Sequence, residues 1–232
     1  MTIPQIETGK RHDEPMNFSL IIPLPASTPY GNLQLKHITI MSRLDEANRQ
    51  IGIAYAEWDK FTAQRTRPGV ELTNAFELHR FAMEYATTQL RRVADEFIAL
   101  LWCLDTYRQQ GQYPERIEID SIGTMFRKKD YPGPESVLQP HHNMLRALND
   151  ISNAKKHSFI DSDVTVAGAD EPAISALTQK HGAQVSEPKF YIVPLSRLVS
   201  DYNPFLHDCN GWLRAYAATP APAAPDFSAW TS

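Results

Sequence analysis

The residues best suited to chemistry lie on one predicted helix, between residues 140 and 159. At 100° per residue, six polar side chains share a stripe about 100° wide on this helix. They are His142, Arg146, Asn149, Asp150, Asn153 and His157. Asn and Asp favour helix interiors less than Glu, Lys, Arg or Gln do, so their gathering on one face needs a reason beyond contact with water. This stripe is the candidate functional site.

Within the stripe, Asp150, Asn153 and His157 form the compact unit, with Lys156 beside it. Arg146 precedes His157 by eleven residues, which is roughly 16 Å along a helix axis. One straight helix therefore cannot bring both side chains to the same phosphate. A symmetric homodimer could place Arg146 of one copy near His157 of the other.

The segment SNAKKH, from Ser152 to His157, resembles the end of the motif in HEPN domains. These are all-helical dimeric modules of prokaryotic toxins, defence systems and nucleases, in which Arg, usually followed by Asn, precedes a His within one helix. Asn153 and His157 match the Asn-x-x-x-His part, and Ser152 stands at the Arg position. The resemblance covers residues 73–159. It implies a HEPN-like module that binds RNA or a nucleotide in a defence or toxin–antitoxin-like system, with the ribonuclease activity degenerate where Ser replaces Arg.

If the protein is an enzyme, the resemblance implies a metal-independent ribonuclease. His157, with an ordinary pKa of about 6.5, would exchange a proton with a ribose 2′-hydroxyl or a leaving 5′-oxygen. Asn153 and Asp150 would complete the catalytic group, and Arg146, Lys156 and Arg92 would bind the substrate and its developing charge. No metal and no other cofactor is expected.

Three other interpretations of the same residues stay open. The polar stripe of an amphipathic helix can simply face water, and Lys155, Lys156 and His157 can complement the negative end of the helix dipole. The protein would then be a non-catalytic protein-interaction or scaffolding module. A metal-dependent helical-bundle hydrolase would instead need at least three His or carboxylate side chains converging on one point.

A second group of charges precedes the most apolar part of the longest predicted helix. Arg91 with Asp95, and Arg92 with Glu96, have the i,i+4 spacing of helical ion pairs. Charges this close to an apolar segment are partly buried and must be paired. The alternative is that Arg92 lines the same cleft as Asn153 and His157.

The composition predicts a globular chain with a substantial core. Of 232 residues, 42% are hydrophobic, and 23 Lys and Arg face 27 Asp and Glu, for a net charge of −4. This excludes wholesale disorder and argues against wrapping a long nucleic acid, while a local RNA or nucleotide site remains open. No run approaches eighteen uncharged apolar residues, so we expect a soluble cytoplasmic protein without membrane contact.

Periodicity and turn signals predict a mainly helical bundle of four to five helices, with a small β-hairpin or sheet at one edge. The predicted helices are 42–66, 73–110, 119–128, 140–159 and 195–217, the last interrupted near Pro204, and they pack around residues 93–104. An N-terminal extension, 1–41, would carry a β-hairpin from strands 20–24 and 33–40. The helical domain, 42–217, would hold a β-containing insertion near 160–194, with strands 163–167 and 189–193 flanking a helix over 171–181. An Ala/Pro-rich flexible tail, 218–232, would follow.

Overall fold

The fold is mainly helical with a small two-stranded antiparallel sheet, as predicted. A computed structural model describes residues 2–9, 21–65, 73–128, 134–157, 170–178 and 189–219. The elements in chain order are α1 (Leu33–Arg65), α2 (Thr73–Gln110), α3 (Ile122–Arg127), α4 (Glu135–Leu138), the 3-10 turn η2 (Gln139–His141), α5 (His142–His157), β1 (Ala173–Thr178), β2 (Lys189–Pro194) and α6 (Leu195–Ala218).

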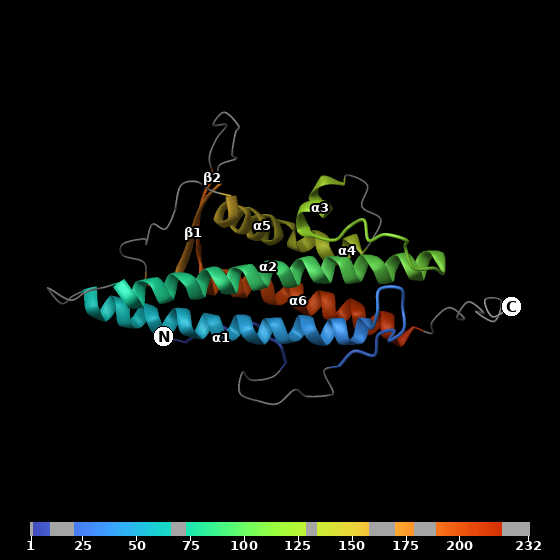
Figure 1. The fold of residues 1–232 in the computed structure, drawn as a ribbon, viewed down its shortest axis with the longest axis horizontal. Helices are drawn as coiled ribbons and strands as arrows, with labels where there is room; N and C mark the ends of the chain where they lie inside the picture. The colour runs from blue at the N-terminus through green and yellow to red at the C-terminus, as the bar shows by residue number, and fades with distance from the viewer. Residues whose placement is uncertain are drawn as a thin grey trace.

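The two longest helices, α1 and α2, form an antiparallel pair, and the other elements are arranged around α2 (Figure 1). In that view α3, α4 and α5 lie on the side of α2 opposite to α1, and α6 runs along the pair. The β1–β2 hairpin stands at the end of α5, against which β1 packs. Helix α2 is therefore the central element of the fold.

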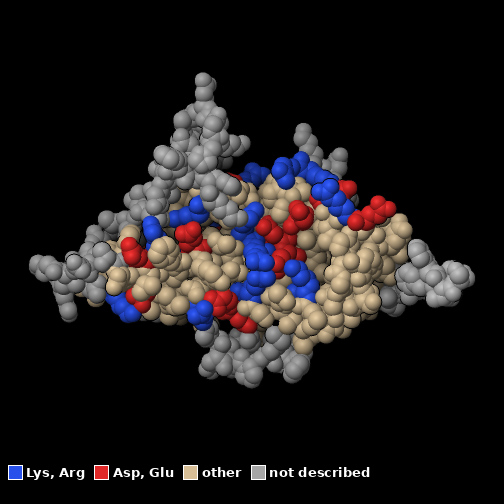
Figure 2. Space-filling view, in the orientation of Figure 1, with Lys and Arg blue, Asp and Glu red and all other residues tan. Residues whose placement is uncertain are grey.

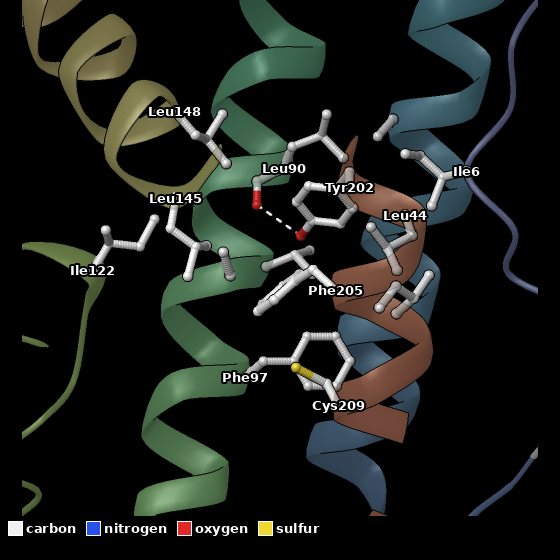
Figure 3. Close-up of a cluster of buried hydrophobic side chains, with 14 of the residues drawn as sticks. Ile6, Leu44, Leu90, Phe97, Ile122, Leu145, Leu148, Tyr202, Phe205 and Cys209 are labelled. Carbon is white, nitrogen blue, oxygen red and sulfur yellow. Dashed lines mark hydrogen bonds between the residues drawn. The ribbon is translucent and has the colours of Figure 1, made fainter. Parts of the chain in front are cut away.

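The core lies where α1, α2, α5 and α6 meet (Figure 3). Leu44 of α1, Phe97 of α2 and Leu148 of α5 are fully buried there. Tyr202 of α6 is also fully buried, and its hydroxyl donates a hydrogen bond to the carbonyl oxygen of Leu90, 2.9 Å away. Because a buried phenol needs a hydrogen-bond partner, this contact fixes the position of α6 against α2.

The predicted strand at 33–40 is wrong, because these residues form the first two turns of α1. The side chain of Asn32 accepts a hydrogen bond from the Leu35 amide at 2.9 Å, as a helix N-cap does. His37 and Ile40 lie three residues apart and are both buried on one helical face. Packing of this face against the core prevails over the strand preference of the β-branched residues.

The N-terminal hairpin is therefore absent from the described residues, and the sheet of this fold comes from the insertion. Strand β2 confirms the strand predicted at 189–193. The helix predicted over 171–181 is wrong, since β1 occupies 173–178 and pairs with β2. The apolar residues of this segment fit both the period of a helix and that of a strand. Pairing with β2, together with the burial of Ile174 and Ala176, favours the strand. The strand predicted at 163–167 lies outside the described residues.

The remaining helices largely follow their predictions. Helix α2 has the predicted bounds 73–110, and Gly111 ends it with a φ of 71° and an amide bonded to the Tyr107 carbonyl at 2.8 Å. The helix predicted from Pro140 begins as the turn η2 and continues as α5. Helix α6 passes through Pro204 without the predicted interruption. None of the described helices is both long and apolar enough to cross a membrane. The predicted tail lies almost wholly outside the described residues.

Two Phe→Ala substitutions test the placement of α6 in the core. Phe205 is fully buried on α6, and Phe81 on α2 is 54% exposed. We expect Phe205→Ala to lower the free energy of unfolding by about 3–5 kcal/mol. The matched surface substitution Phe81→Ala should change it by less than about 0.5 kcal/mol. Urea denaturation of both variants measures the difference, and equal losses would contradict this core.

Candidate functional site

The polar stripe of α5 faces away from the core, as the helical geometry predicts. Leu145, Leu148 and Ile151 are buried on the opposite side. Arg146 is exposed, while the rest of the described stripe is half-buried, which includes His142, Asn149, Asp150 and Asn153. The side chains of Lys156 and His157 lie outside the described part of the structure. The structure thus places five residues of the predicted stripe on one surface and leaves the positions of the Lys156 and His157 side chains as predictions.

Helix α3 covers the first half of the stripe. The guanidinium of Arg146 lies over the ring of Phe126, 4.9 Å from its centroid, and the His142 ring meets the same ring edge-on at 5.2 Å. Asn149 approaches α3 closely, since a Cβ added at Gly123 would lie 3.8 Å from its side-chain oxygen. An aromatic face orients a guanidinium but leaves its charge uncompensated. Arg146 has no carboxylate partner among the described residues, so its N–H donors are available to an anion.

Strand β2 covers the second half of the stripe through Tyr191. The Tyr191 hydroxyl donates a hydrogen bond to the Asp150 carboxylate at 2.8 Å. Burial, and then the hydrogen bond to Asp150, raises the pKa of Tyr191 to about 12, so the phenol keeps its proton at neutral pH. Asp150, predicted as a catalytic residue, is therefore an acceptor that ties α5 to the hairpin. The sequence gives no signal for this contact because the two residues are 41 positions apart.

Ser152, at the Arg position of the HEPN resemblance, points toward the core. It is 2% exposed, and its hydroxyl oxygen has no hydrogen-bond partner within the described ranges. It lies on the same side of α5 as the buried Leu145 and Leu148, whereas Asn153 lies on the polar stripe. A longer cationic side chain at position 152 would have to displace core atoms or turn out of the helix face. The local packing therefore fits Ser better than Arg.

Arg92 belongs to a second charged site, which we call the cationic cluster: Lys36 and Arg43 of α1 with Arg92 and Glu96 of α2. The Glu96 carboxylate lies 3.2 Å from Lys36, 3.4 Å from Arg43 and 3.4 Å from Arg92. The predicted Arg92–Glu96 pair is thus confirmed, and α1 adds two cations that no local spacing could indicate. Figure 2 shows cationic and acidic side chains gathered at the centre of the face that carries α2.

The neighbouring pair, Arg91 and Asp95, is turned toward a different element. Its predicted ion pair is present at 3.5 Å. Asp95 also accepts a hydrogen bond from the Ile122 amide, 2.8 Å away, at the start of α3. Because successive residues of a helix point about 100° apart, Asp95 contacts α3 while Glu96 contacts α1. Among the described residues, Arg92 pairs with Glu96, the carboxylate that Lys36 and Arg43 of α1 also approach, and no contact joins Arg92 to Asn153 on α5.

Neither a metal group nor a known relative defines the site. Within the described ranges, no three His, Cys, Asp or Glu side chains are placed so that they could hold a metal ion. A scan against protein-family models and searches of curated proteins and solved structures found no match.

Tyr191→Phe tests the contact between the hairpin and α5. At pH 7 we expect it to lower the free energy of unfolding by about 1 kcal/mol, since one hydrogen bond is lost. The pKa of Tyr191 rises from 10.0 in the unfolded chain to about 12 in the fold, so its stabilising contribution is complete below pH 10 and disappears as pH rises toward 12. Urea midpoints measured across this range should therefore fall more steeply for wild type than for Tyr191→Phe. Parallel pH curves would show that Asp150 does not hold the phenol.

Proposed function

We propose that the protein is a HEPN-like helical module that binds RNA, or the phosphates of a nucleotide, at the cationic cluster without hydrolysing it. Lys36, Arg43 and Arg92 would contact the phosphates, and Arg146 on α5 would make a further contact with a longer RNA. Asn153 and the predicted residues Lys156 and His157 belong to the separate stripe of α5 and would contact only a longer RNA.

The observation that carries the proposal is the imbalance of charge around Glu96. Three cations approach this one carboxylate within 3.4 Å, which leaves two positive charges at one place on a chain of net charge −4. Each phosphate contact requires a cation, and excess cations held close together favour a ligand with more than one phosphate. Arg92 is 55% exposed and Lys36 41% exposed, so both can reach a ligand without leaving the fold.

Two features of α5 support binding without hydrolysis. Ser152 stands where active HEPN domains would carry Arg, and it is buried against the core. The Asp150 carboxylate, within the stripe, accepts the hydrogen bond of Tyr191 and acts as a structural acceptor. A phosphorane-like transition state needs cations or donors aimed at its oxygens, and these two positions supply neither.

A second candidate function, a protein-interaction module without chemistry, is supported by a different surface. Leu78, Phe81 and Tyr85 lie on one face of α2 at spacings of three and four residues, and each is about half exposed. Contiguous exposed apolar side chains mark interaction surfaces. This surface lies outside the cationic cluster, so the two functions can be separated by substitution.

Titration of a fluorescent single-stranded RNA with the purified protein tests the proposed function. Arg92→Ala and Lys36→Ala should each weaken binding and lower the slope of log affinity against log salt by about one. Glu96→Gln should strengthen binding, because it removes the carboxylate that competes with phosphate. Arg197→Ala is the matched control, since Arg197 is 70% exposed and paired with Asp201 on α6.

Two results would contradict this proposal. Affinities unchanged in all three cluster variants would refute binding at the cationic cluster and favour the protein-interaction function. The RNA should also stay intact in EDTA with wild type and with His157→Ala. Cleavage by wild type that His157→Ala abolishes would overturn the non-hydrolytic part of the proposal.

A further inference from the structure

A cavity of about 130 Å³ lies between the N-terminal segment, residues 2–9, and helices α1 and α6. A cavity needs roughly 10–15 Å³ of this kind of space to hold one water molecule, so this one is larger than a water site. Its wall includes Glu7 and Thr8 of the segment, His37 of α1, and Asn210 and Arg214 of α6. It is separate from both the cationic cluster and the stripe of α5.

The N-terminal segment forms a fixed wall of this cavity because two asparagines hold its backbone. Asn48 of α1 accepts from the Ile6 amide at 2.7 Å and donates to the Ile6 carbonyl at 2.9 Å. Asn203 of α6 accepts from the Glu7 amide at 3.0 Å and donates to the Gln5 carbonyl at 3.1 Å. The Ile6 side chain is 2% exposed and anchors the segment in the core. The shape of the cavity is therefore set before any ligand arrives.

The cavity is also lined by a buried polar pair. His37 is 2% exposed and Asn210 8% exposed, and the His37 Nε2 lies 2.8 Å from the Asn210 side-chain oxygen. Burial, more than any other cause, lowers the pKa of His37, so the ring is neutral near pH 7 and its Nε2–H donates to this oxygen. The Asn210 amide NH2 then has no acceptor among the described residues. The NH2 group of Asn210, a residue that lines the cavity, is thus a donor held in a fixed orientation without an acceptor among the described residues.

Arg214 supplies the positive charge at the cavity. It lies close enough to His37 that its charge contributes to lowering the pKa of that imidazole. No carboxylate pairs with Arg214 within the described ranges, while Glu7, the acidic residue of the wall, is exposed to solvent. Arg214 and the Asn210 amide therefore both bring to the cavity donors that have no protein acceptor among the described residues.

We infer that this cavity binds a small oxyanion, a carboxylate or a phosphate group, held by the Arg214 guanidinium and the Asn210 amide. Charge-assisted hydrogen bonds from a planar guanidinium suit both anions, because two oxygens can be bound at once. The apolar side chains of Met41 and Leu206 also line the cavity and would contact the carbon atoms of an organic anion.

Isothermal titration calorimetry of the full chain with inorganic phosphate, and separately with acetate, tests this inference. We expect saturable binding of one anion per chain for at least one probe, and the probe that binds identifies the oxyanion. Arg214→Ala should weaken it at least tenfold. Asn210→Asp keeps an oxygen for His37 but replaces the donor by a negative charge, so it should abolish binding. Arg197→Ala, on the same helix, should bind as wild type does.

The results that would overturn the inference are distinct from those for the RNA site. An absence of saturable binding for both probes, or full affinity in the exposed-site variant Arg214→Ala, would refute an oxyanion site in this cavity. If Arg92→Ala rather than Arg214→Ala loses phosphate binding, the anion sits on the cationic cluster. Failure of RNA to bind leaves the prediction for the cavity unchanged, because Arg214 and Asn210 take no part in the proposed RNA contact.

Discussion

The enclosure of the middle of α2 is the constraint on which the rest of the structure depends. From Phe97 to Leu104 this helix is apolar on every side, so no single neighbour can cover it. Helix α1 covers one side and α5 and α6 cover others, and Tyr202 anchors α6 through its bond to the Leu90 carbonyl. Burial of this segment thus decides how many helices the fold needs and where they lie.

The same constraint explains where the charges gather. The turn of α2 that precedes its apolar segment cannot reach open water on all sides, so its four charged residues must find partners. Asp95 accepts a hydrogen bond from the amide at the start of α3, and Glu96 forms ion pairs with Lys36 and Arg43 of α1. The excess of cations at Glu96 is therefore a by-product of packing, and the proposed phosphate site rests on it.

The sequence predicted the elements with strong helical periodicity and failed where short apolar runs fit two periods. Helix α2 was predicted with its exact bounds, because a long pattern with a glycine stop is unambiguous. Residues 33–40 and 173–178 were misassigned, since their state depends on tertiary packing and on strand pairing. For the site, the i,i+4 pair Arg92–Glu96 was predictable, whereas Lys36, Arg43 and Tyr191 were not. These three residues are distant in sequence from their partners Glu96 and Asp150, so no local spacing predicts the contacts.

The asparagine contacts of the N-terminal segment have a consequence for the order in which the protein assembles. Asn203 bonds to Gln5 and Glu7, which are 198 and 196 positions away in the chain. During synthesis Gln5 and Glu7 leave the ribosome long before α6 exists, so this contact can close only when α6 has been made. Closing so large a loop is slow and entropically costly until the rest of the bundle has brought its ends together. The anchoring of Ile6 between α1 and α6 is thus a late step of folding, although Ile6 itself is translated well before α6.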